Sequence, residues 1–284
     1  MLRRTTLAVL LPFGALLCSL IGPAWLHAQA AREPTGETFV SADQVRLWRK
    51  QLADLSKPPR SAPEGWSKSR LDPGRLVAEF PELRIKPQYV LRAYLYKRGG
   101  NANGFVWALP KEAEFPEPAD CPKLESHFLH PPKPFDALDD VMEAIAGDDS
   151  PSSYVHASLL RRALREFGAE WHGIRWGAHS VLDREPWGED ADRDAEVPAS
   201  RPMSERGEWK WLTDAPRDWR PQVVWTPDRV TVRFYTYTAL GQVTAGDEME
   251  KERITLHTDV YRRRNYRALT TEKKLAEGPN TIMF

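Results

Sequence analysis

Histidines and carboxylates set the first limits on what chemistry this chain can do. Five of its seven histidines fall between His127 and His179. His127 and His130 have an HxxH spacing, which on a turn can bring two imidazoles to one metal ion. A zinc hydrolase needs three protein ligands and an open position, so His172 or His179 would have to supply the third ligand. No HExxH or similar compact signature is present, so a zinc-dependent hydrolase is an alternative function only.

A second candidate site is the run Asp190-Ala191-Asp192-Arg193-Asp194. Alternate carboxylates on a tight loop can converge on Ca²⁺, which makes a calcium-stabilised adhesion-type module the second alternative. An EF-hand would need glycine at the sixth position and glutamate at the twelfth, where this chain has Ala195 and Arg201. A solvated acidic loop is the simpler interpretation.

Tryptophan is the strongest compositional signal, with 11 in the chain. Exposed indoles can stack on sugars, hold apolar peptides or bind cations, although filling of the core is the competing explanation for most of them. Trp209 and Trp211 would share one face of an extended segment. A basic cluster begins at Arg262. The sequence predicts an aromatic and arginine binding surface formed by Trp171, Trp176, Trp209, Trp211, Arg262 and Arg263.

Nucleophilic catalysis has no support, because the chain contains neither a GxSxG elbow nor an SxxK motif. Cys121 follows Asp120, and an acidic neighbour does not activate a thiol, so we expect a buried, inert cysteine. The main hypothesis is therefore a non-catalytic binding or assembly protein that requires no cofactor. Its expected partner is an envelope protein or a glycan.

The first 30 residues have the pattern of a secretory signal peptide. Arg3 and Arg4 precede an apolar run from Leu7 to Leu20, and Ala28-Gln29-Ala30 matches a cleavage site. We expect cleavage after Ala30 and an extracytoplasmic protein, periplasmic or alternatively secreted. An uncleaved anchor is the other interpretation of this segment, and no other stretch approaches membrane length.

The charge balance argues against a nucleic-acid partner. The chain has 40 basic and 40 acidic side chains. Nucleic-acid binding rests on a basic surplus, which is lacking here.

Local patterns define the elements that must position these residues. Ser41-Ala42-Asp43-Gln44 resembles a capping box and predicts a helix that ends at Lys57-Pro58-Pro59. Residues 57–75 resemble a Pro-rich linker. Tyr89–Lys97 and Phe105–Leu109 predict a hairpin joined by a glycine-rich turn, and Pro110–Pro134 contains too many prolines for a regular element.

The second half of the chain predicts two helices and then strands. One apolar stripe runs from Leu138 to Ile145, and Ser150 with Pro151 begins a second helix. Expected strands are Gln222–Thr226, Val230–Thr238 and Ile254–Tyr261, with a further candidate inside Trp171–Leu182. Residues 183–207 resemble an acidic insertion, and the tail from Arg262 to Phe284 resembles a short helix with a loose end.

These elements predict an α+β fold. We expect an antiparallel sheet of five to six strands backed by two to three helices, with a half-open barrel of the same strands as the alternative. The expected divisions are a leader (1–30), an N-terminal helix with its linker (31–75) and one α+β domain (76–284).

Overall fold

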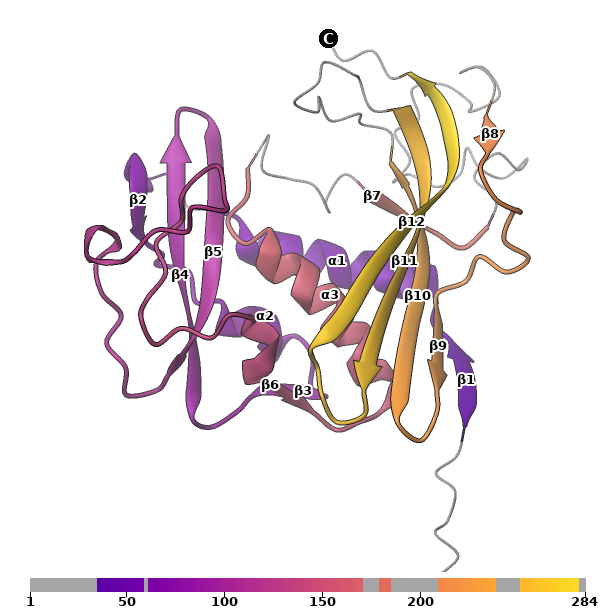
Figure 1. Cartoon of the computed structure of the whole chain (residues 1–284), viewed down its shortest axis with the longest axis horizontal. Coiled ribbons are helices and arrows are strands. Elements are labelled where there is room, and N and C mark those ends of the chain that lie inside the picture. Colours follow the sequence, from indigo (N-terminus) through magenta and orange to yellow (C-terminus); the bar gives the residue numbers. More distant parts are fainter. Residues whose placement is uncertain (1–34, 59–60, 171–178, 185–208, 239–250, 281–284) are drawn as a thin grey trace, which may run out of the picture. The chain divides into compact units, whose positions relative to one another are not determined.

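The computed structural model describes residues 35–58, 61–170, 179–184, 209–238 and 251–280 (Figure 1). All of them belong to one structural unit, Glu33–Phe284. The expected leader and the acidic run at 190–194 lie outside the described residues. Within the described ranges, no helix has both the length and the apolar character needed to cross a membrane.

The largest element is a seven-stranded antiparallel sheet that curls into a half-barrel (Figure 1). One strand, β7, pairs with the upper part of β10, beyond the end of β9. The strands follow the order β1 (Gly36–Phe39), β9 (Gln222–Trp225), β10 (Arg229–Thr238), β11 (Lys251–Arg262), β12 (Ala268–Asn280) and β8 (Lys210–Trp211), with β7 (His179–Leu182) beside β10.

Two smaller sheets and three helices make up the rest of the described part of the unit, which confirms the expected α+β class. The first small sheet contains β2 (Gly65–Lys68), β4 (Tyr89–Arg98) and β5 (Asn101–Pro110), and the second pairs β3 (Leu83–Ile85) with β6 (Ile145–Gly147). The helices are α1 (Ala42–Ser56), α2 (Gly74–Ala78) and α3 (Pro151–Arg165), and short 3-10 turns cover Pro118–Asp120 and Val141–Ala144.

The long helix α3 begins where the sequence predicts. The Ser150 side chain accepts a hydrogen bond from the Ser153 N–H, and Pro151 occupies the first turn, where its missing N–H costs nothing. Helix α1 also matches its prediction, but the Ser41 side chain makes no capping hydrogen bond. The buried faces of both helices contact each other, and α3 also contacts β5, β9 and β10.

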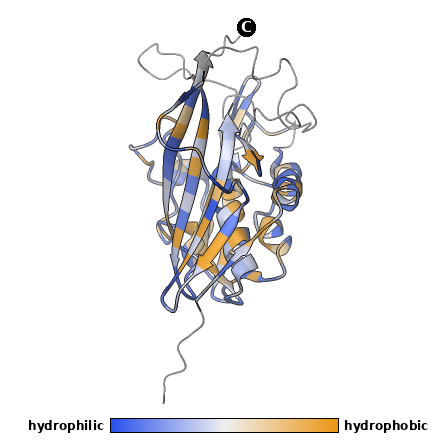
Figure 2. Cartoon of the chain, turned by 90° about the vertical axis from the view of Figure 1, so that its right-hand side faces the viewer, coloured by the Kyte–Doolittle hydropathy of each residue, from blue (hydrophilic) through white to orange (hydrophobic). Residues whose placement is uncertain are grey.

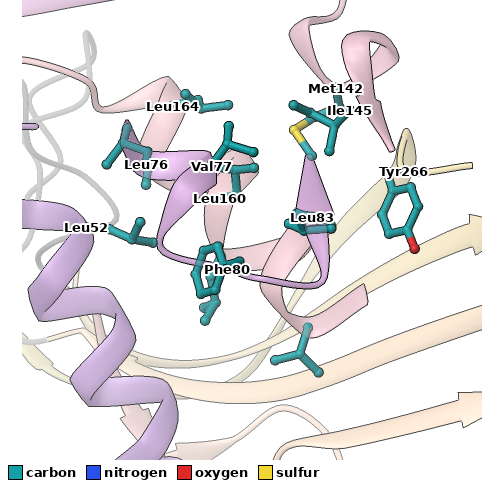
Figure 3. Packing of buried hydrophobic residues seen from close by; sticks show 14 of the residues in the cluster. Leu52, Leu76, Val77, Phe80, Leu83, Met142, Ile145, Leu160, Leu164 and Tyr266 are labelled. Atoms are coloured by element: carbon teal, nitrogen blue, oxygen red, sulfur yellow. The ribbon is translucent and has the colours of Figure 1, made fainter. Parts of the chain in front are cut away.

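The main core therefore lies between the helices and both larger sheets. Leu52 of α1, Leu76 of α2 and Leu160 of α3 are buried in one cluster with Phe80 (Figure 3). Side chains of the seven-stranded sheet that belong to this cluster, such as Val232, define its inner face. The opposite face is called the outer face, and hydrophilic and hydrophobic residues alternate along the strands (Figure 2).

Several local predictions were wrong. The stripe from Leu138 to Ile145 is not a helix, since a 3-10 turn at Val141–Ala144 leads directly into β6. The tail is a strand, β12, because Ala268–Asn280 pairs with β11 along its length. Part of the expected linker forms β2, which pairs with β4.

Candidate functional site

The histidines of the alternative zinc site that lie in the described residues belong to separate elements. His127 Nδ1 accepts a hydrogen bond from the Leu129 N–H at 3.1 Å, and His130 is exposed beside Glu125. His179 belongs to β7 of the large sheet, on a different element, and His172 lies outside the described residues. The described ranges contain no group of three or more histidine, cysteine or carboxylate side chains placed to hold a metal. Asp190, Asp192 and Asp194 are likewise outside them.

The tryptophans of the described chain are not an exposed platform. Trp209 and Trp211 are half-buried and pack with Trp219 on a second apolar cluster, formed with Tyr237 and Ile254. Trp219 lies 5.3 Å from the Tyr235 ring, centroid to centroid. The segment that carries Trp209, Trp211 and Trp219 thus covers the upper part of the outer face of the sheet. Trp171 and Trp176 fall outside the described residues.

The two arginines expected in the binding surface have different environments. Arg263 makes a bidentate ion pair with Asp149, with Nη2 2.6 Å from Oδ2. The hydrogen bond from Arg263 lowers the pKa of Asp149 to about 2, with a further contribution from Tyr154. Arg263 therefore anchors the β11–β12 turn to the loop before α3. Arg262 is exposed and has no acidic partner within ion-pair distance among the described residues.

The lower part of the outer face carries an apolar row across four strands. Leu269 is paired with Val260, Val260 with Thr231, and Thr231 with Val224. Val224 and Val260 are half-buried, and Leu269 is 71% exposed. Neighbouring strands are about 4.8 Å apart, so the row extends over roughly 15 Å.

Arginines border this row on both sides. Arg229 lies directly opposite Arg262, and Arg233 lies two positions beyond Thr231 on the same face. Like charges directly opposite each other destabilise a sheet, so fold stability does not explain the Arg229–Arg262 pair. Arg229 has a carboxylate beside it, Asp228 at 3.4 Å, whereas Arg233 has no acidic partner in the part of the chain that is described.

A cation–π pair extends the same face toward β1. The Arg220 guanidinium lies 3.9 Å from the centroid of the Phe39 ring, and both side chains are exposed. Asp218 binds this guanidinium from the other side. We define the outer-face surface as the row and its bordering arginines: Val224, Arg229, Arg233, Val260, Arg262 and Leu269.

Sequence reasoning found Arg262 but missed Arg229 and Arg233. The available signal was their alternation with Thr231 on a strand whose intervening residues, Val230 and Val232, are apolar. This pattern places the arginines on the solvent side of a half-buried strand. It gives no indication of which neighbouring strand supplies Arg262.

A polar network occupies the inner face of the sheet above the apolar core. The Thr236 hydroxyl lies 2.8 Å from Nε2 of His257 and 3.2 Å from Nδ1 of His179. His257 Nδ1 lies 3.3 Å from the Glu272 carboxylate. Burial lowers the pKa of both histidines, to about 3 for His179, so His179 is neutral at pH 7.

The order of these groups, hydroxyl then imidazole then carboxylate, is that of a nucleophilic triad. Thr236 is fully buried, however, and a nucleophile must reach its substrate. The network instead satisfies polar groups that would be costly to bury unpaired. We therefore assign it to stability.

Cys121 is buried, as expected. Its Sγ lies 3.2 Å from the Tyr94 hydroxyl and belongs to a third cluster with Trp107. It plays no part in the outer-face surface.

Comparison with known proteins found no matching family model, no matching curated protein and no matching solved structure. The outer-face surface combines an apolar centre with guanidinium groups that bind carboxylates in a bidentate manner.

Proposed function

We propose that this chain is a non-catalytic binding or assembly protein whose outer-face surface binds an acidic protein. The observation that carries the proposal is the placement of Arg229, Arg233 and Arg262 around a partly exposed apolar row. Arginine at a partly desolvated contact gives both affinity and orientation toward carboxylates. The expected export leader would place this partner in the periplasm or outside the cell.

The apolar row favours a protein over a glycan or a nucleic acid. Val224, Val260 and Leu269 would lose water only against a partner that has apolar side chains of its own. Sulfated glycans and nucleic acids present charge with little matching apolar surface. The tryptophans at 209 and 211 act indirectly in this proposal, because they cover the upper outer face and leave the lower part open.

The test is fluorescence anisotropy with a labelled extended peptide that alternates glutamate and leucine. We expect saturable binding that weakens with salt, because exposed charges are screened within about 10 Å at 0.1 M ionic strength. The double variant Arg233→Glu, Arg262→Glu should bind at least tenfold more weakly. Arg92→Glu with Arg98→Glu is the matched control, since both arginines are exposed on β4, in the small sheet.

Three further probes decide the class of partner: polyglutamate, a DNA duplex and a sulfated glycan. Weaker binding of all three than of the glutamate–leucine peptide supports the proposal. Equal binding of any of them would show a general polyanion surface and overturn the acidic-protein assignment. Equal losses in the outer-face variant and in the control variant would also overturn it.

A further inference from the structure

Two phenylalanines are the most exposed large apolar side chains in the described chain. Phe128 is 77% exposed and Phe135 is 79% exposed. Both belong to residues 110–139, which we call the acidic segment. This segment begins at the last residue of β5 and packs on the small sheet through Phe115 and Leu124. Exposure of two aromatic rings so close in sequence is a feature of binding surfaces.

Short hydrogen-bonded turns hold both rings outward. The His130 N–H donates to the His127 carbonyl oxygen, and this bond closes a turn of which Phe128 is a central residue. Trp66 Nε1 donates to the Leu129 carbonyl oxygen at 3.2 Å, and this bond fixes the turn to β2. His130 has φ +46°, a left-handed conformation that side chains other than glycine rarely adopt.

The second ring is held in the same way. The Ala137 N–H donates to the Pro134 carbonyl oxygen, so Phe135 is also inside a closed turn. Leu138 N–H then donates to the Ala108 carbonyl oxygen, which fixes the turn to β5. Because both turns are already ordered, binding through them requires little further loss of conformational entropy.

The acidic segment has a net charge opposite to that of the three arginines of the outer-face surface. It has seven carboxylates against three lysines, a net charge of −4. Glu125 is 86% exposed near Phe128, and Asp136 is exposed next to Phe135. Lys133 is occupied by an ion pair with Asp139.

We infer that the partner of the outer-face surface is a second copy of this chain, which docks its acidic segment there with Phe128 and Phe135 on the apolar row. This inference rests on the proposed function and names its partner. The charges are complementary, and each surface supplies apolar groups for the other.

The contact would be heterologous, because the two surfaces belong to different sheets of one chain. The acidic segment packs on the small sheet, and helices α1 and α3 lie between that sheet and the seven-stranded sheet (Figure 1). Each copy therefore offers one donor segment and one acceptor face. A head-to-tail contact of this kind extends to further copies unless a ring closes.

Sedimentation velocity of the purified chain, over micromolar to millimolar concentrations, tests the inference. We expect concentration-dependent oligomers that dissociate as salt rises from about 0.01 M to about 1 M, because the Debye length falls from about 30 to about 3 Å. Phe128→Ser with Phe135→Ser removes the donor, and Arg233→Glu with Arg262→Glu removes the acceptor. Each double variant alone should associate at least tenfold more weakly.

A mixture of the two double variants gives the decisive result. The first keeps its acceptor face and the second keeps its donor segment, so the mixture should form a one-to-one complex and nothing larger. Arg92→Glu with Arg98→Glu should oligomerise like the unaltered chain. Circular dichroism should show the native fold for every variant, since all substituted side chains are exposed.

The remaining outcomes separate this inference from the proposed function. A chain that stays monomeric at every concentration, but binds the glutamate–leucine peptide, overturns self-association and leaves the acidic-protein proposal in place. A chain that does neither overturns both. Oligomers that persist in both double variants, or a mixture that forms no complex, overturn the assignment of these two surfaces.

Discussion

Replacement of Asp259 by asparagine should destabilise the protein strongly, although the change is nearly isosteric. Asp259 is fully buried on the inner face of β11 and forms a bidentate pair with Arg162 of α3, at 2.5 and 3.1 Å. Burial alone raises the pKa of Asp259, but Arg162 outweighs it and holds the pKa below its usual value. The carboxylate is therefore charged at pH 7.

The magnitude follows from the charge that remains. Asparagine leaves the Arg162 guanidinium buried without a counter-charge, and breaking a buried pair in this way costs about 3–5 kcal/mol. In a domain of this size each 1 kcal/mol shifts Tm by about 2–4 °C, so we expect a fall of roughly 6–20 °C.

Differential scanning calorimetry and urea unfolding measure this effect. The control is the double variant Arg162→Met, Asp259→Leu, which removes both charges and should be far less destabilised than Asp259→Asn alone. A Tm within about 2 °C of the unaltered chain, less than the shift for 1 kcal/mol, would refute the reasoning for Asp259→Asn. A double variant as unstable as the single one would show that packing, and not charge, holds this site.

Four further predictions concern stability. Burial holds the pKa of His179 at about 3, whereas the pKa of an unfolded histidine is near 6.5. The contribution of His179 to the free energy of unfolding is therefore fully present above about pH 6.5 and is lost as the pH drops toward 3. Urea unfolding at neutral and mildly acidic pH should show this slope, His179→Gln should flatten it, and an unaltered slope in that variant contradicts the assignment. Asp149→Asn should cost about 2 kcal/mol at pH 7, because the depressed pKa of Asp149, about 2, contributes stability above about pH 4 that is lost as pH falls through 2. Removal of Arg263 should lower stability to a similar extent in the same unfolding assay, and an effect on peptide binding alone would contradict its anchoring role. Trp211→Ala should lower Tm but leave affinity for the glutamate–leucine peptide unchanged, and a loss of affinity at full stability would return the tryptophans to the binding surface.

Local patterns in the sequence correctly predict the two long helices, α1 and α3, and the longer strands β4, β5, β10 and β11. Ser150 and Pro151 fix the start of α3 within one turn of chain, because capping involves only the next three residues. The alternation of apolar and polar residues along Val230–Thr238 is also a local pattern, and it predicts β10. Prediction failed for β12, where the charged run Glu272-Lys273-Lys274 interrupts any apolar alternation, and only pairing with β11 makes the segment a strand.

The sequence does not reveal which face of β11 is buried. Alternation alone favours Leu256 and Val260 as the core face, yet His257 and Asp259 point inward. The reason is Arg162, 97 positions earlier in the chain, which neutralises Asp259 and makes its burial tolerable. Long-range charge pairing of this kind leaves no periodic signal in the sequence.

The outer-face surface shows the same division. The basic cluster in the sequence predicts that both Arg262 and Arg263 belong to a binding surface, because they are adjacent in sequence and chemically identical. Asp149, brought close by the fold, pairs with Arg263 and makes it structural, whereas strand pairing places Arg262 opposite Arg229 on the open face. The sequence determined which side chains were available, and the tertiary structure decided which of them stay exposed, because Asp149, which pairs with Arg263, lies 114 positions away in the chain.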